Sequence, residues 1–257
     1  KLSILLAKIE TTYGTDPTPS KTTDVITVQN VDFVPLEHET DDNNEIRLSF
    51  GKAPKIIAAV HGRVSFEVLL SGGGLPLGTL PNHAILMRAC GVAMTVNAGA
   101  DVTASLVSAG EESITIWFYI GTVLYKMTGA RGTWETVYEA KKAPRMKFTF
   151  TGLAKNFIDG TVTGPTIPTL QPPLAVVKGV TTVSIAGVSA FVSSYSINLG
   201  NDVQYRNLTG VEEVIIADRT MSGKIKFELP PVATQDLLGT AGIITLGSQV
   251  SVPIKQG

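Results

Sequence analysis

The sequence contains few of the residues that most catalytic and metal sites need. It has a single cysteine, Cys90, so an intrachain disulfide is excluded and a disulfide scaffold is not expected. Its three histidines, His38, His61 and His83, show no spacing typical of metal ligands. We therefore expect no catalytic residue, no metal and no cofactor, and a protein that is not an enzyme.

Charge is also scarce, and its two signs are balanced. Charged residues make up 17% of the chain, below the roughly 25% that is usual for soluble domains. Two interpretations remain open: the chain hides much of its surface in partners, or it is a compact β domain with a bland surface. The net charge is −1 and no basic stripe stands out, which argues against tight binding of nucleic acid.

Long apolar runs are missing as well. The most apolar stretch, residues 114–123, is interrupted by Thr115, Gly121 and Thr122. It falls short of the roughly 18 apolar residues of a membrane-spanning helix, so no membrane is expected among the partners.

One seven-residue pattern occurs twice. Gly62–Val68 (GRVSFEV) and Gly223–Leu229 (GKIKFEL) share a glycine, a cation, a β-branched residue, a polar residue, Phe, Glu and an apolar residue. Similarity at such long spacing indicates one structural unit that is used twice. We therefore predict that the chain is partly duplicated.

Alternation divides each copy of this pattern into an apolar face and a polar face. The apolar faces, which we predict to be buried, carry Val64, Phe66, Val68, Ile225, Phe227 and Leu229. The polar faces carry Arg63, Ser65, Glu67, Lys224, Lys226 and Glu228. Such a polar face is either solvated or part of a sheet that continues across subunits.

Most of the remaining chain is predicted to be β, with short helices at 3–10, 81–90 and 231–238. Gly91 directly after the second helix is a typical stop signal. Residues 174–186 are among the segments predicted as strands.

Residues 160–173 hold four prolines and two glycines and predict a semi-rigid linker. The predicted organisation is an N-terminal arm at 1–24, a first β module at 25–160 and a second, shorter β module at 161–257.

An acidic stretch separates two predicted strands, Val25–Leu36 and Ile57–Leu70. We predict a hairpin with a long charged loop at Glu37–Glu45, and such loops are usually functional or mobile. Calcium binding is the less favoured interpretation, since the spacing and central glycine of an EF-hand are absent.

Several segments, in their order and spacing, resemble the major tail tube proteins of long-tailed, non-contractile bacteriophages (the siphophage type). They are residues 6–17 (LAKIETTYGTDP), 67–74 (EVLLSGGG), 86–91 (LMRACG), 126–133 (KMTGARGT) and 146–152 (MKFTFTG). The resemblance covers much of residues 1–152 and extends less clearly to Asp218–Leu229.

This resemblance implies a tail-tube-type β-sandwich or barrel with short flanking helices. Its copies would form rings that stack into a hollow tube, with strands of neighbouring subunits joined around the lumen. The long hairpin loop, here Glu37–Arg47, would reach the adjacent ring, and Leu199–Glu213 would be its second-half counterpart. The implied ring-stacking residues are Glu37, Glu39, Asp41, Asp42, Asn43, Asn44, Glu45, Arg47, Asn201 and Asp202.

The resemblance also implies the partners. Single-domain relatives use six copies for a ring, so a duplicated chain would need three for a pseudo-sixfold ring; both counts stay open. Tail terminator, tail tip and tape measure proteins would bind the tube, and double-stranded DNA would pass through without specific binding. The protein would be assembled in the host cytoplasm and reside in the virion tail. The two polar strand faces would line the lumen or lie between subunits.

The alternative is a carbohydrate-binding or adhesin-type β-sandwich of a virion. This function needs an exposed aromatic platform, and the chain has only two tryptophans, Trp117 and Trp134. Trp117 lies in an apolar strand that we predict to be part of the core.

Overall fold

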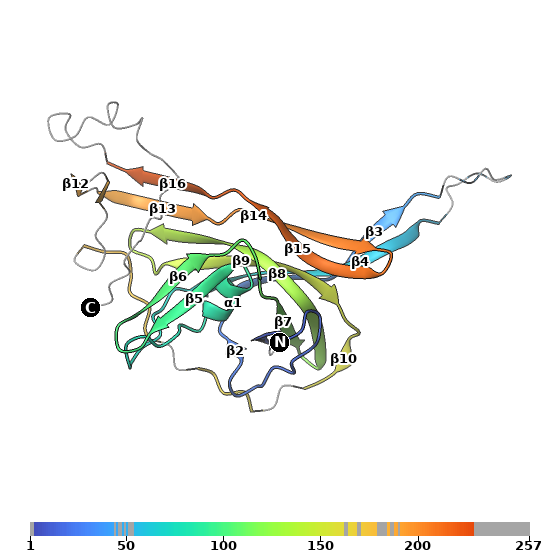
Figure 1. The fold of residues 1–257 in the computed structure, drawn as a ribbon, viewed down its shortest axis with the longest axis horizontal. Helices are drawn as coiled ribbons and strands as arrows, with labels where there is room; N and C mark the ends of the chain where they lie inside the picture. Colours follow the sequence, from blue (N-terminus) through green and yellow to red (C-terminus); the bar gives the residue numbers. More distant parts are fainter. Residues whose placement is uncertain are drawn as a thin grey trace.

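The fold, taken from a computed structural model, is mostly β with one short helix among the described residues, which confirms the predicted fold class (Figure 1). The structure describes residues 3–43, 45, 48, 50, 54–161, 164–168, 171–178, 184–185, 188–189 and 191–228. The predicted helix at 231–238 lies outside these residues.

Ten strands form one large antiparallel sheet. They are β1 (Ser3–Ile9), β2 (Val25–Ile26), β3 (Gln29–Asp41), β4 (Ile56–Leu69), β7 (Ile114–Ile120), β8 (Val123–Glu139), β9 (Arg145–Ala154), β10 (Ile158–Asp159), β13 (Val192–Asn198) and β16 (Ser222–Phe227). Three two-stranded ribbons accompany it: β5 (Val92–Asn97) with β6 (Asp101–Leu106), β11 (Ser184–Ile185) with β12 (Val188–Ser189), and β14 (Asn201–Leu208) with β15 (Val211–Arg219).

The large sheet folds into two layers because β8 belongs to both. The first part of β8 pairs with β7, and its second part pairs with β9 and β13. The register shifts between Thr128 and Arg131, where Gly129 takes a positive φ of 59°. Such a bulge bends a strand. The four-strand layer therefore runs β2-β1-β7-β8, with the two-residue β10 also paired to the first part of β8, and the six-strand layer runs β3-β4-β9-β8-β13-β16.

The core lies between these layers. Leu5, Ile114 and Ile116 from the four-strand layer meet Phe66 and the six-strand layer's other inward residues in one buried cluster. The partners of Phe66 there are Val64, Val68, Phe148 and Phe150. Burial of Val64, Phe66 and Val68 confirms the predicted apolar face of the first repeat copy.

The helix α1 (Ala84–Arg88) confirms the helix predicted near Pro81–Cys90, although it is shorter. Leu86 and Cys90 pack into the core. Gly91 follows with a φ of 74°, the left-handed conformation that ends a helix with little strain in glycine.

The helix predicted over residues 3–10 is wrong, because Ser3–Ile9 forms strand β1. This strand pairs with β7 from Ser3 opposite Ile120 to Ile9 opposite Ile114. Its central residues Leu5, Leu6 and Ala7 are all buried, so both faces of the strand are covered. A strand covered on both faces carries a continuous apolar run, which resembles a helix segment in sequence.

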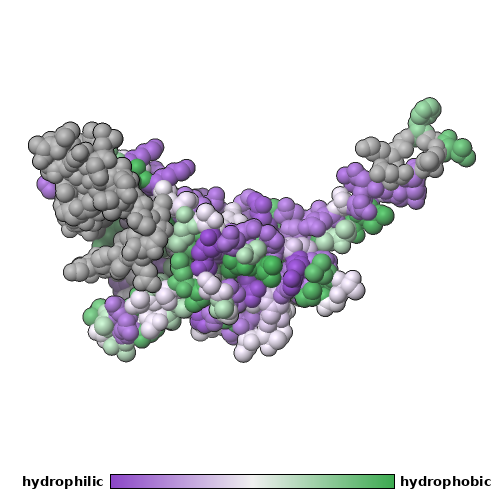
Figure 2. Space-filling model, turned by 45° about the horizontal axis from the view of Figure 1, so that its top comes forward, coloured by the Kyte–Doolittle hydropathy of each residue, from purple (hydrophilic) through white to green (hydrophobic). Residues whose placement is uncertain are grey.

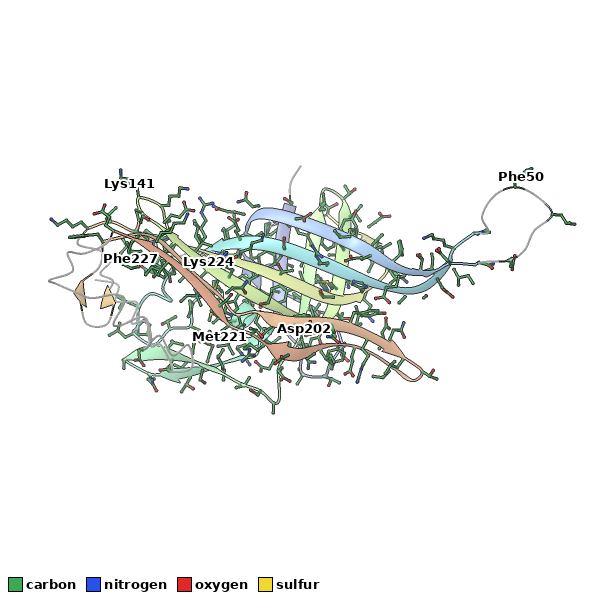
Figure 3. The ribbon with its side chains drawn as sticks, turned by 90° about the horizontal axis from the view of Figure 1, so that it is seen from above. Phe50, Lys141, Asp202, Met221, Lys224 and Phe227 are labelled. Atoms are coloured by element: carbon green, nitrogen blue, oxygen red, sulfur yellow. The ribbon has the colours of Figure 1, made fainter. Side chains whose placement is uncertain are left out.

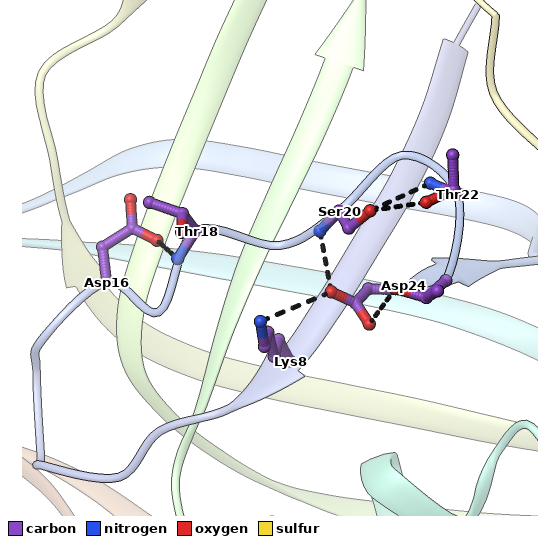
Figure 4. Close-up of polar contacts among 7 residues, drawn as sticks. Lys8, Asp16, Thr18, Ser20, Thr22 and Asp24 are labelled. Atoms are coloured by element: carbon purple, nitrogen blue, oxygen red, sulfur yellow. Dashed lines mark hydrogen bonds and ion pairs between the residues drawn. The ribbon is translucent and has the colours of Figure 1, made fainter.

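The turn after β1 holds the N-terminal segment against the sheet (Figure 4). The Asp24 carboxylate accepts a hydrogen bond from the Ser20 amide at 2.7 Å and lies 3.9 Å from Lys8 Nζ. The buried Glu10 carboxylate accepts bonds from Ser113 Oγ and Thr115 Oγ1, each at 2.6 Å. These contacts fix β1 within its own chain.

Two other predicted elements differ from the structure. The predicted strands 123–128 and 133–139 form one strand, β8. Of the predicted strand 174–186, the described residues contain the two-residue β11 and a single bridge from Val176 to Ala140. Through β13 and β16 the second half continues the sheet of the first, and the boundary at residue 160 stays a prediction.

Candidate assembly surfaces

The first candidate surface is a projecting hairpin, the arm, which comprises residues 37–57. It leaves the body as a narrow ribbon at the right of Figure 1. Glu37, Glu39 and Asp41, predicted to lie in a loop, instead lie in β3 and pair with β4 opposite His61, Ala59 and Ile56. The loop is therefore shorter than predicted, because cross-strand pairing with β4 extends into the acidic stretch.

The described residues near the tip of the arm include exposed apolar side chains, although the stem is acidic. Leu48 and Phe50 are fully exposed, and Ile56 and Ile57 are more than half exposed. Figure 2 shows this change of character along the projection at its right. Soluble proteins rarely leave such groups uncovered without a binding role. The sequence analysis did not select these four residues.

Three of the remaining predicted loop residues, Asp42, Asn43 and Glu45, are described. Asp42 forms an ion pair with Lys55 at 3.0 Å. The Asn43 side chain accepts a hydrogen bond from the Glu45 amide at 3.2 Å. Asn44 and Arg47 lie outside the described residues.

The base of the arm is braced by the β14–β15 ribbon. The His61 ring stacks on Tyr205 with centroids 4.8 Å apart, and its Nε2 lies 3.4 Å from the Glu37 carboxylate. Burial, together with the hydrogen bond that the Tyr205 hydroxyl donates to Glu212, raises the pKa of Tyr205 to about 12. Tyr205 therefore stays a neutral donor, and the stacked pair packs the base of the arm against the ribbon.

The second predicted stacking loop, Leu199–Glu213, is instead this ribbon. Asn201 is buried, and its Nδ2 donates to the carbonyl oxygens of Cys90 and Gly132 at 2.8 Å each. Its Oδ1 accepts from Arg219 Nε at 2.7 Å. Asn201 thus joins three segments of the body, whereas Asp202 is exposed. The alternation of Val203 and Tyr205 with polar residues is typical of a strand, and it could have predicted this ribbon from the sequence.

The second candidate surface is the outward face of the six-strand layer. Residues directly opposite each other in a sheet share a face. Glu67 lies opposite Lys147, which lies opposite Glu135. Farther along, Arg145 lies opposite Val137, Val137 opposite Ser196, and Ser196 opposite Lys224. One continuous face therefore crosses from β4 to β16.

This register brings both predicted polar faces together on one surface, the polar face. Arg63, Ser65 and Glu67 of β4 share it with Lys224 and Lys226 of β16. Glu228 follows the end of β16 and is exposed. The sequence analysis missed the other charged members, which are Asp32, Arg131, Glu135, Glu139, Arg145 and Lys147.

Charge is balanced across the polar face. The register assigns ten charged residues to it, and one of them, Arg131, lies beneath the β14–β15 ribbon. The other nine comprise five cations and four carboxylates, and Arg145 pairs with Glu67 at 3.4 Å. The β14–β15 ribbon lies over the part nearest the arm, where Arg131 donates to the Val214 carbonyl at 2.8 Å. The residues of the rest of this face are half-buried or exposed, and the described ones form no dense cationic track for a polyanion.

The third candidate surface is the exposed border formed by β16. In the described part of the chain β16 pairs only with β13, and β3 pairs only with β4, so the six-strand layer has a free edge at each side. Ile225 is 43% exposed and Phe227 is half-buried, although both were predicted to be buried. The prediction fails because β16 lies beyond the four-strand layer that covers β4. Leu229 lies outside the described residues.

The tryptophans do not form the platform that the carbohydrate-binding alternative requires. The Trp117 indole donates to Asp16 at 3.2 Å, and Lys126 Nζ lies 4.0 Å above its ring. Trp134 packs against the core cluster.

Among the described residues no group of three or more His, Cys, Asp or Glu side chains is arranged to hold a metal ion. Within the same ranges, no helix has the length and apolar character needed to cross a membrane.

Comparison with known proteins gives one family. A search of curated proteins finds no significant match. The sequence profile of the family described as "Phage tail tube protein" matches residues 1–250, which confirms the resemblance found in the sequence. A match over nearly the whole length, on a mostly-β chain with two free sheet edges, identifies a structural component of a phage tail: the chain belongs to the phage tail tube protein family.

Proposed function

We propose that copies of this chain join side by side into rings, and that the rings stack into a tube through which the phage genome passes. The observation that carries this proposal is the six-strand layer, which has free edges on both sides and an arm projecting along its strands. The edges face sideways, as contacts between neighbours in one ring require. The arm projects along the strands, as contacts between stacked rings require.

The strand directions support lateral joining. Every neighbouring pair in the six-strand layer is antiparallel, so β3 and β16 run in opposite directions. When β16 of one copy meets β3 of the next, the sheet continues with antiparallel pairing. A closed ring then removes every exposed edge, which is a physical reason to assemble.

We propose that the polar face lines the lumen. Its balanced charge would let double-stranded DNA pass without specific binding, because affinity for the phosphate backbone depends on a surplus of cations. Three copies would supply about 18 strands, and barrels of about 16–18 strands enclose a water-filled channel. Six copies would give a wider barrel.

The arm supports stacking of the rings. It continues the direction of β3 and β4 beyond the body, so it leaves the plane of a ring whose strands follow the tube axis. We propose that terminator, tip and tape measure proteins bind the finished tube, and that assembly takes place in the host cytoplasm.

Negative-stain microscopy of the purified full-length protein tests the proposal. We expect rings of uniform diameter and tubes built from them. A protein that stays strictly monomeric by light scattering at high concentration, without rings in any field, would overturn it.

A shortened arm separates the two kinds of contact. Residues 42–55 are replaced by Asn-Gly, which closes a two-residue hairpin between Asp41 and Ile56. We expect rings that no longer stack, with an unchanged melting temperature. Tubes of normal length from this variant would show that the arm does not stack the rings.

A further inference from the structure

The two copies of the repeated pattern belong to two hairpins of the same construction. The strand β4, which carries the first copy, pairs with β3, and this hairpin continues into the arm. The strand β16, which carries the second copy, pairs with β13, and this hairpin continues into the β14–β15 ribbon. Arm and ribbon extend from their base strands towards the same end of the molecule (Figure 1). The ribbon therefore takes the place in the second hairpin that the arm takes in the first.

A bulge at the same position supports the equivalence of the two hairpins. The register of the first hairpin shifts within Gln29–Asp32 of β3, next to Phe66 of the pattern. The register of the second shifts within Val192–Ser194 of β13, next to Phe227 of the pattern. In both hairpins the extra residue lies on the first strand. Since bulges are retained features of a fold, the shared position indicates that the hairpins correspond in structure as well as in sequence.

The pairs that follow the two bulges also correspond. Phe33 of β3 lies opposite Val64 in the first hairpin, and Tyr195 of β13 lies opposite Ile225 in the second. At the same position, therefore, an aromatic side chain faces a β-branched one, a pairing that stabilises adjacent strands. The similarity of β4 and β16 thus extends to the strands with which they pair.

The hairpins differ where they leave the large sheet. The strands β3 and β4 continue into the arm, whereas the second hairpin is interrupted between β13 and β14 and between β15 and β16. Gly200 lies at this interruption with a φ of 64°, and a Cβ there would come within 2.0 Å of the Thr220 carbonyl oxygen. Figure 3 shows that the hairpin changes direction near Met221 and Asp202. The ribbon is therefore turned onto the body, while the arm projects.

The ribbon meets the body at the bend of β8. The Tyr13 hydroxyl accepts a hydrogen bond from the Val214 amide of the ribbon at 2.5 Å and donates one to the Gly129 carbonyl of the bend at 3.2 Å. Burial raises the pKa of Tyr13, which keeps the hydroxyl protonated as a donor. Tyr13 thus joins the ribbon directly to the bend.

Two further side chains connect the ribbon to the same bend. Asn201, the first residue of the ribbon, donates to the Gly132 carbonyl at 2.8 Å. Arg131 of β8 donates to the Val214 carbonyl of the ribbon, also at 2.8 Å. A bulge disrupts the regular ladder of hydrogen bonds, and buried polar groups there need other partners. Together with Tyr13, these side chains tie the ribbon to the bend.

We propose that the ribbon is a second arm, which the subunit holds on its own body as a clamp on the bend of β8. The bend carries β8 from one layer to the other, so a clamp at this place supports the angle between the layers. Each copy then presents one projecting arm, although it contains two hairpins of this kind. The proposal concerns the isolated subunit and does not depend on the formation of rings.

Removal of each extension by the same operation tests the proposal. In one variant Asn-Gly replaces residues 201–219 and closes a two-residue hairpin between Gly200 and Thr220, where the Thr220 amide already donates to the Gly200 carbonyl at 2.9 Å. The matched control is the variant in which Asn-Gly replaces residues 42–55. We expect the amides of residues 129–132 to exchange at least tenfold faster without the ribbon and at the wild-type rate in the control. Hydrogen exchange of the isolated subunits, read by mass spectrometry, measures both rates.

Two results of this experiment would overturn the proposal. Wild-type exchange at the bend in the absence of the ribbon would show that the ribbon does not clamp it. Loss of protection in β13 and β16, with the rest of the sheet unchanged, would show that the ribbon is an integral part of their pairing and no separable arm. Formation or loss of rings in these variants bears on the proposed function alone.

A pair of single substitutions gives a measurement that does not require a shortened chain to fold. Tyr13→Phe removes the hydroxyl that joins Val214 to Gly129. Tyr205→Phe, the matched control, removes a hydroxyl that donates to Glu212 within the ribbon. We expect Tyr13→Phe to accelerate exchange at least threefold both at Val214 and at the bend, and Tyr205→Phe to change neither. Acceleration at only one of the two sites, or equal effects of the two substitutions, would contradict the clamp.

Discussion

The strands β4 and β16 carry the same sequence pattern but occupy different environments. In β4 the side chains of Val64 and Phe66 are completely buried, whereas Ile225 in β16 is 43% exposed. Neighbours on both sides and a second layer above cover β4, while β16 pairs with β13 alone in the described chain. The pattern thus specifies a strand with two unlike faces, and burial is decided by what lies opposite. The uncovered copy remains available to a partner.

The largest expected difference between the copies concerns their phenylalanines. Phe66→Ala should destabilise the isolated subunit by about 3–5 kcal/mol, because it leaves a cavity among packed rings. Phe227→Ala, the matched change in β16, should cost less than about 1.5 kcal/mol because that ring is already partly hydrated. Urea unfolding of both variants measures their free energies of unfolding. Equal losses of free energy in the two variants would contradict the different burial of β4 and β16.

The next largest effect concerns pH and the helix that follows β4. Burial lowers the pKa of His83 to about 4 from its ordinary 6.5. The unfolded chain therefore binds a proton more readily between these values, so stability should be full above about pH 6.5 and fall by about 3 kcal/mol towards pH 4. Unfolding of His83→Gln across this range should show a smaller slope than the wild type.

The same substitution at the exposed His38 provides the control and should leave the slope unchanged. A His83→Gln variant that kept the wild-type slope would show that His83 is not buried in its neutral form.

A smaller effect distinguishes two adjacent residues of the β14–β15 ribbon. Asn201→Ala should cost about 1–3 kcal/mol, because the carbonyls of Cys90 and Gly132 would lose their donor inside the protein. Asp202→Ala should stay within about 0.5 kcal/mol, as expected for an exposed position. Thermal unfolding checks the pair, and a reversed order would show that Asn201 belongs to an exposed loop after all.

Sequence reasoning succeeded where the pattern is local. Alternation identified the buried face of β4, and Gly91 marked the end of the short helix. Local patterns failed where the outcome depends on distant neighbours. Ser3–Ile9 became a strand because β2 and β7 flank it, and Glu37–Asp41 joined β3 because β4 offers a pairing partner despite the low strand propensity of acidic residues.

The candidate surfaces show the same difference between features set by local patterns and features set by distant neighbours. The polar faces of the two copies were recognised from sequence, but their position on one continuous surface follows from the order of strands between them. The apolar arm tip was missed because exposure of Leu48 and Phe50 is a property of the folded hairpin. Asn201 was assigned to a loop since its three partners come from segments far away in the chain.

Hydrogen exchange of the two strands, in the isolated subunit and in the assembled tube, tests the central claim most directly. Amides of β4 should exchange slowly in both states, since that strand has neighbours on both sides. Amides of β16 that face its free edge should exchange quickly in the subunit and become protected in the tube, where β3 of a second copy pairs with them. Edge-facing amides of β16 that exchange equally fast in subunit and tube would contradict the account.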